Sequence, residues 1–146
     1  HPTLLMSALE EVIDLVVAAE GPLWLANRPH EVVRLDVCGG GAVVMSVDAW
    51  LADAPPQAWA AATPWRRVRA EDVWDPYAGD RENRVVLLTV GDEDDARRAL
   101  AWLDTAVLTD AELAAGGESW SGVEDPFEPW LGQPWPVHPD VVASSG

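Results

Sequence analysis

The sequence contains no lysine: all nine basic residues are arginines, against 25 acidic residues. A Walker phosphate loop and a Schiff-base enzyme both need a lysine, so neither chemistry belongs to this chain. The formal net charge of −16 and the pI of about 4.2 also disfavour DNA, RNA and anionic membranes, because these partners bind clustered Lys and Arg. We therefore expect no nucleic acid and no membrane among its partners.

Paired cysteines and long apolar runs are missing as well. The single cysteine, Cys38, excludes an internal disulfide, which fits a cytoplasmic protein. The sequence shows neither a transmembrane run of about eighteen apolar residues nor the pattern of a signal peptide. A chain of 146 residues fits one domain. Because it opens on His1 directly into a helical pattern, we expect a piece of a longer protein in preference to a processed product.

Three consecutive glycines, residues 39–41, lie between two segments in which apolar residues alternate with other residues. The first segment places Val33, Leu35 and Val37 on one face, and the second continues with Val43 and its alternate neighbours Met45 and Val47. A period of two predicts half-buried strands. Since a cradle of the Walker type would need a lysine, the glycines predict the turn of a β-hairpin and no phosphate site.

Helical signals occur in three places. Residues 4–19 carry apolar side chains at helical spacing, and residues 92–104 begin with acids that suit a helix N-terminus. Residues 109–115 form the clearest local signal, because Thr109 and Glu112 make a capping box and glycines follow. We expect a buried stripe on the second helix, made of Ala99, Leu100, Trp102 and Leu103.

Strand signals flank a long connection. Residues 23–26 predict a short strand, and the nearly continuous apolar run 84–90 predicts a central strand. Prolines interrupt residues 50–72, which predicts an irregular connection fastened to the core by Trp59 and Trp65.

The order of these elements predicts an α+β fold. We expect a mostly antiparallel sheet of about four strands with two or three helices packed on one face. The folded domain spans residues 1–130, and residues 131–146, rich in Pro, Ser and Gly, predict an extended or disordered tail.

The most distinctive polar stretch is the run 74–81. Asp75, Asp80 and Arg81, together with His30, have the residue types of an acid pair with a guanidinium clamp. The Asp-Pro and Gly-Asp pairs in this run are also ordinary turn chemistry, and the turn is the preferred interpretation.

Two charged clusters could each be a binding site or have an ordinary structural role. Arg66, Arg67 and Arg69 suit either an anion cradle or a solvated segment that pairs with neighbouring acids, and the acidic composition favours the second. The acids 92–95 resemble a metal site, but they lack the glycine and closing glutamate of a calcium loop, so helix-dipole complementarity is preferred.

The histidines and the cysteine have no metal-ligand spacing. His1, His30 and His138 are far apart in sequence, and a zinc site made of His30, Cys38 and an acid is less favoured than a packed, inert thiol. No catalytic, cofactor-binding or metal-ligating residue is therefore assigned.

Several weak markers occur together in a recognisable order. After a leading His-Pro and an amphipathic helix, the sequence reads LWLANRPHEVV, GGG, WDPYAGDR, LDTAVLTDAELAAGG and DPFEPW. From His1 to about Trp130 this order resembles the C-terminal domain of the CobW family of P-loop GTPases. Two details depart from that family: Ala106 stands where members often have cysteine, and residues 85–90 differ from the usual strand.

The resemblance implies a non-catalytic interaction and regulatory domain of a GTP-dependent zinc or cobalt chaperone, with a link to cobalamin biosynthesis. It implies two partners, the GTPase domain of the same polypeptide and a metalloprotein client. It also implies GTP, Mg and a transition metal for the parent protein and no cofactor for this chain.

The alternative is a free-standing acidic ligand-binding protein or enzyme that uses the Asp75, Asp80 and Arg81 region with His30. A tryptophan-rich apolar patch on the uncovered sheet face would favour the interaction domain. A cleft with perturbed pKa values at the polar run would favour the enzyme.

Overall fold

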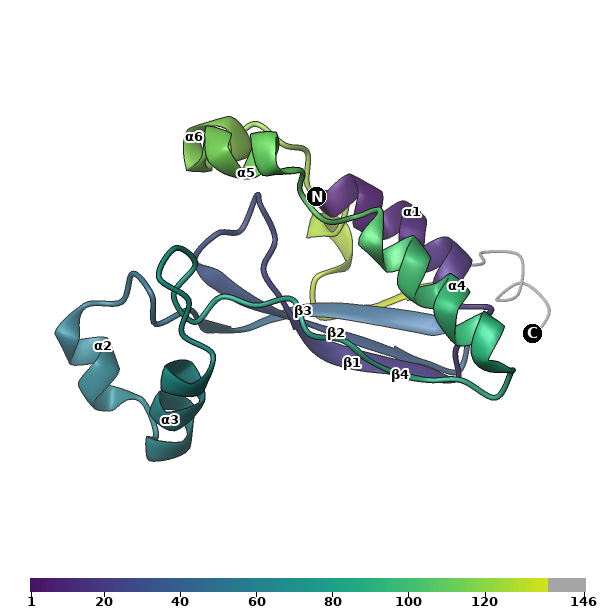
Figure 1. Cartoon of the computed structure of the whole chain (residues 1–146), viewed down its shortest axis with the longest axis horizontal. Helices are drawn as coiled ribbons and strands as arrows, with labels where there is room; N and C mark the ends of the chain where they lie inside the picture. The colour runs from purple at the N-terminus through teal and green to yellow at the C-terminus, as the bar shows by residue number, and fades with distance from the viewer. Residues whose placement is uncertain (137–146) are drawn as a thin grey trace.

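The computed structural model describes residues 1–136 and shows an antiparallel five-stranded sheet with two long helices against one face (Figure 1). The α+β class predicted from the sequence is confirmed, and the strand order is β4-β1-β2-β3-β5. The helices are α1 (Pro2–Val12), α2 (Pro56–Ala61), α3 (Pro64–Asp72), α4 (Glu93–Asp104), α5 (Asp110–Ala115) and α6 (Gly117–Trp120), with a 3-10 turn η1 at Glu128–Trp130. The strands are β1 (Ala18–Leu23), β2 (Glu31–Cys38), β3 (Gly41–Ala49), β4 (Val86–Leu88) and β5 (Pro134–Pro136).

The core lies between the sheet and the helices α1 and α4, which run side by side over it (Figure 1). The alternation in β2 is confirmed, since Val33, Leu35 and Val37 are all buried. In β3 the covered face carries Ala42 and Val44, the partners of Val37 and Leu35 in the register. The prediction had grouped Val43 and its alternate neighbours as the apolar face, which is wrong because the two-residue turn aligns Val44 with Leu35.

The hairpin turn is confirmed in detail. Cys38 pairs with Gly41, so Gly39 and Gly40 are the two turn residues, with φ of 61° and 80°. Positive φ at both central positions is the geometry that matches the twist of a hairpin, and glycine adopts it without steric cost.

The N-terminal helix is shorter than its periodicity predicts, and the following strand begins earlier. The helix ends at Val12, and residues 18–23 form β1, which hydrogen-bonds to β2 on one side and β4 on the other. The predicted helix over 4–19 and strand over 23–26 are therefore wrong at their boundaries. Hydrogen bonds to two neighbouring strands satisfy the backbone N–H and C=O groups of residues 18–23. They stabilise the strand more than the helical spacing of apolar residues, which continues as far as Val16, stabilises a longer helix.

The connection over residues 50–72 contains helices, contrary to the prediction. Pro56 and Pro64 each occupy the first turn, where a missing N–H costs no hydrogen bond. The two helices project beyond one end of the strands (Figure 1). Trp59 is half-buried and donates from Nε1 to the Leu51 carbonyl oxygen at 2.9 Å, whereas Trp65 is 77% exposed and does not pack in the core.

The apolar run 84–90 forms a short edge strand, β4, and the prediction of a central strand is wrong. It pairs with β1 alone, and Val86, Leu88 and Val90 are exposed. Hydrophobic composition cannot distinguish an edge from a centre, because this is decided by how many neighbours the sheet provides.

The predicted helices over 92–104 and 109–115 are confirmed as α4 and α5, with Asp92 and Thr109 as their N-caps. The stripe predicted on α4 is wrong in part, since Ala99 is buried but Leu100 and Trp102 are exposed. None of the helices within residues 1–136 is long and apolar enough to cross a membrane. β5 falls in the segment predicted as a tail and hydrogen-bonds to β3, while residues 137–146 lie outside the described part.

Candidate functional site

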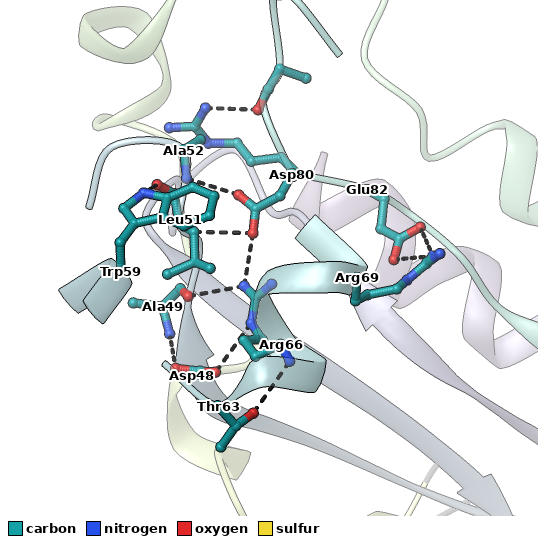
Figure 2. A network of polar contacts seen from close by, with 12 residues as sticks. Asp48, Ala49, Leu51, Ala52, Trp59, Thr63, Arg66, Arg69, Asp80 and Glu82 are labelled. Atoms are coloured by element: carbon teal, nitrogen blue, oxygen red, sulfur yellow. Dashed lines mark hydrogen bonds and ion pairs between the residues drawn. The ribbon is translucent and has the colours of Figure 1, made fainter. Parts of the chain in front are cut away.

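Asp80, one of the acids of the distinctive polar run, is a buried structural carboxylate (Figure 2). It accepts hydrogen bonds from the backbone N–H groups of Leu51 at 3.1 Å and Ala52 at 2.8 Å. Arg66 Nη2 donates to its second oxygen at 2.8 Å. A buried charge needs such partners, and here the three donors join the end of β3, the helix α3 and the polar run.

The arginines of α3 also bind this helix to neighbouring segments of the chain. Arg66 also contacts Asp48 at 3.4 Å and donates to the Ala49 carbonyl oxygen at 3.2 Å, while Arg69 forms an ion pair with Glu82 at 2.7 Å (Figure 2). Arg67 donates to the carbonyl oxygens of Trp59 and Ala60. The preferred interpretation, pairing with neighbouring acids, is confirmed for Arg66 and Arg69.

Asp75 closes a turn at the start of the same run. Its Oδ1 accepts the N–H groups of Tyr77 and Ala78, both at 2.8 Å, and its backbone bridges to Gly79. These backbone hydrogen bonds, to Ala78 and to Tyr77, lower the pKa of the Asp75 carboxyl below its ordinary value. This is the predicted turn chemistry.

The Arg81 side chain contacts Asp53 and not Asp80. It forms an ion pair with Asp53, donates to the carbonyl oxygens of Pro29 and Ala78 at 3.3 and 2.9 Å, and lies 5.4 Å from the ring centre of Trp24. His30 Nδ1 is 3.3 Å from the same Asp53 carboxylate. The structure thus joins His30 and Arg81 through Asp53.

The less favoured alternative, an acid pair of Asp75 and Asp80 clamped by Arg81, is therefore not formed. Asp80 faces Arg66, and Arg81 faces Asp53. Neither Arg66 nor Asp53 was linked to the run by any local motif, because both partners come from other segments of the chain. The sequence indicated only that the arginines of α3 would form ion pairs with neighbouring acidic residues.

Cys38 and His30 lie at opposite ends of β2, which puts them about 25 Å apart at the rise of a strand. The Cys38 thiol is exposed beside the hairpin turn. Within residues 1–136 no three His, Cys, Asp or Glu side chains gather closely enough to hold a metal ion. His138 lies outside the described residues.

An apolar cavity of about 390 Å³ lies among α1, the end of β1, the approach to β4, and the helices α4 to α6. Its wall includes Trp24 and the buried Trp120, whose rings meet edge to face with centroids 5.8 Å apart. Leu100 and Val107 also line it, although they are 51% and 58% exposed, so apolar surface continues outward from the cavity. The remaining lining residues are mostly apolar: His1, Leu5, Leu23, Leu25, Ala26, Asn83, Val85, Leu103, Asp104, Ala106, Leu108 and Leu113.

A second hollow of about 340 Å³ adjoins this cavity. The two share His1, Ala26, Leu108 and Trp120, and the second reaches along α5 to Glu112. Trp120 Nε1 donates to the Glu112 carbonyl oxygen at 2.9 Å, which holds the ring between the two hollows. No sequence motif indicated this site, since its lining comes from six separated segments.

The sheet face away from the helices carries both charged and apolar side chains, since the exposed Val86 and Leu88 of β4 are the register partners of Glu20 and Ala18. Arg34 contacts Glu20 at 2.9 Å and Asp36 at 3.1 Å on this face. The strands β1 to β4 contain no tryptophan, so they do not form the tryptophan-rich patch that would have favoured the interaction domain. Exposed aromatic side chains occur instead on and after α3, where Trp65, Trp74 and Tyr77 are 77%, 47% and 66% exposed.

Comparison with known proteins finds relatives named for zinc handling. Over 143 residues the chain is 37% identical to a zinc chaperone of Mycobacterium tuberculosis and to an uncharacterised protein of Mycobacterium bovis, covering 97% of this chain and 35% of each relative. It is 25% identical over 113 residues to zinc-regulated GTPase metalloprotein activator 1 of Dictyostelium discoideum, covering 77% of this chain and 23% of that protein. The chain spans about a third or less of the length of these relatives. No family model matches the sequence, and no solved structure matches it.

Proposed function

Because the similarity to a zinc chaperone and to a zinc-regulated GTPase activator supports a relation to the CobW family, we propose that this chain is the C-terminal interaction and regulatory domain of a GTP-dependent metallochaperone. Its role is to recognise the client and to dock on the GTPase domain of the same polypeptide. GTP, Mg and the transition metal, zinc or cobalt, bind elsewhere in the parent protein.

The observation that carries this proposal is the match over 97% of the chain at 37% identity to a zinc chaperone of about three times its length. A match of this extent and identity implies that the two share this region throughout. The rest of the relative has no counterpart in these 146 residues, which is consistent with nucleotide chemistry located outside them.

The geometry of the polar run supports binding more than catalysis. Asp80 and Arg81 are both occupied by partners that hold the backbone in place, and the cavity beside Trp24 and Trp120 is mostly apolar. General acid–base catalysis needs a proton-transferring group within reach of a substrate, whereas apolar hollows with exposed rims are typical of recognition surfaces.

The test compares the full-length parent protein with a version that lacks this segment. We expect the truncated protein to keep GTP hydrolysis but to lose the support of growth under zinc limitation, and restoring the segment to restore growth. Hydrolysis of GTP by this chain alone, or normal zinc-limited growth of the truncated strain, would overturn the proposal.

A further inference from the structure

The apolar cavity beside Trp24 and Trp120 has the dimensions of a binding site. Its volume of about 390 Å³ lies within the range of about 300–1,000 Å³ that is common for ligand pockets. We propose that the cavity binds a basic amphipathic segment of the client protein, whose apolar side chains enter it while Lys or Arg side chains lie at its rim. This inference rests on the proposed function for the identity of the partner.

The rim favours a protein segment over a small apolar molecule. Leu100 on α4 and Val107 after it line the cavity and are more than half exposed. A molecule enclosed by the cavity would leave this apolar rim in water, whereas a segment lying across the mouth covers both. Amphipathic helices bind grooves in this way, with anchors at positions i, i+3, i+4 and i+7.

The charge of the surroundings specifies the sign of the partner. Among the described residues that line the two adjoining hollows, the charged side chains are Asp104 and Glu112, and none is an arginine. Two cations nearby already have acceptors: the His1 ammonium donates to the Ala106 carbonyl oxygen at 2.6 Å, and Arg81, which lies against the Trp24 ring, pairs with Asp53. All described arginines near these acids in sequence, Arg97 and Arg98, form ion pairs at the other end of α4. A segment carrying Lys or Arg is thus attracted to this mouth, and the net charge of −16 accelerates its approach.

The lining is held in place before any partner arrives. Trp120 is fixed by its hydrogen bond to the Glu112 carbonyl oxygen, and the backbone N–H of Trp24 donates to Asn83 Oδ1 at 2.9 Å. A preformed wall of aromatic rings lowers the ordering cost of binding, and rigid aromatic anchors are frequent where binding energy concentrates.

The probe is a fluorescein-labelled helical peptide of fifteen residues, with leucines on one face and lysines on the other. Fluorescence anisotropy measures its binding to this chain. The first control peptide replaces each lysine with glutamate, and the second has the same composition in scrambled order. We expect binding by the Leu/Lys helix and at least about tenfold weaker binding by both controls, because one lacks the charge and the other the apolar face.

Matched variants locate the binding site. Leu100→Asp and Val107→Asp each place a charge at the rim and should weaken binding by at least about tenfold. Val90→Asp makes the same charge change at a residue that is 88% exposed and outside the lining, and should alter binding less than about twofold. Asp104→Asn should weaken binding more than Glu11→Gln, a change of equal charge on the surface of α1. Circular dichroism verifies that each variant is folded.

Several outcomes overturn the inference. One is equal binding of the glutamate or scrambled peptide, another is equal effects of Val90→Asp and Leu100→Asp, and a third is no binding at all. Binding by the isolated chain but not by the full-length parent protein would mean that the parent's own polypeptide fills the cavity, which overturns the choice of client. None of these outcomes changes the zinc-limited growth test, so this inference and the proposed function fail separately.

Discussion

Asp80 shows how a residue with catalytic chemistry can have a structural role. Its carboxylate is 1% exposed, and its partners are two backbone N–H groups and the guanidinium of Arg66. If the carboxylate were removed, the two N–H groups would lose this acceptor, and the partly buried guanidinium would keep only Asp48 and the Ala49 carbonyl oxygen. At the residue scale, this one side chain attaches the helix α3 to the segment that follows β3.

Asp80→Ala should lower the free energy of unfolding by about 3 kcal/mol, because two N–H groups lose their acceptor and the partly buried Arg66 guanidinium loses its nearest carboxylate. Urea denaturation followed by tryptophan fluorescence measures the change. The control is Asp94→Ala, which removes an exposed carboxylate that pairs with Arg97 on the surface of α4 and should cost several-fold less. Equal losses in the two variants would contradict the structural role of Asp80.

Glu112 and Asp75 predict a pH dependence at the same scale. The pKa of Glu112 is lowered from its ordinary value of 4.5, first by the backbone N–H of Thr109 and then by the Thr109 hydroxyl, and backbone N–H groups likewise lower the pKa of Asp75 from 3.8. A carboxyl whose pKa is lower in the folded state stabilises the fold above the unfolded value, and this contribution is lost as pH falls through the folded value.

We therefore expect both carboxyl groups to stay ionised below their ordinary pKa values, and stability to fall as they protonate. Carbon NMR titration of the side-chain carboxyl groups measures this directly. In Thr109→Ala the hydroxyl donor is removed, so the pKa of Glu112 should move up toward 4.5 while that of Asp75 stays unchanged. An unchanged Glu112 titration in that variant would contradict the contribution of the Thr109 hydroxyl to the lowered pKa.

At the scale of elements, the junction of β1 with the approach to β4 depends on a glycine. Gly21 has a φ of 156°, and a Cβ there would lie 1.8 Å from the Arg84 carbonyl oxygen. The Arg84 N–H in turn donates to the Pro22 carbonyl oxygen at 3.0 Å. Gly21 and Pro22 lie inside β1, where the backbone at Arg84 approaches too closely for a larger residue.

Gly21→Ala should lower the free energy of unfolding by at least about 2 kcal/mol, since the added methyl group collides with backbone and φ is unfavourable for alanine. Thermal unfolding by circular dichroism measures the loss. Gly117→Ala is the matched control, because nothing lies within 4 Å of the added atom, and it should leave stability unchanged or slightly raised. Similar losses at both glycines would refute the close approach.

At the scale of the whole molecule, charge repulsion opposes folding. The chain has 25 acidic and nine basic residues, so its formal net charge is −16. Repulsion among surface charges destabilises the compact state, and salt screens it within a Debye length of about 10 Å at 0.1 M.

Raising NaCl from 20 to 300 mM should therefore raise Tm by about 4 °C, which corresponds to roughly 1 kcal/mol for a domain of this size. Scanning calorimetry measures the shift. A variant with Glu10→Gln and Glu11→Gln on the exposed face of α1 should start from a higher Tm and gain less from salt. A fall in Tm with salt would show that attractive ion pairs outweigh the repulsion.

The sequence alone determined the features that depend on neighbours along the chain. The Gly39–Gly40 turn, the alternation in β2 and the Thr109/Glu112 capping box were all predictable, because a few adjacent residues set their geometry. The acidic composition and the missing lysine likewise excluded whole classes of function without any coordinates.

Only the tertiary structure decided the features that join distant segments. The end of α1, the edge position of β4, the pairing of Asp80 with Arg66 and the cavity beside Trp120 depend on which segments meet. Local periodicity carries no information about such partners. The physical reason is that burial and hydrogen bonding across the sheet contribute more free energy than the local preference of any one segment.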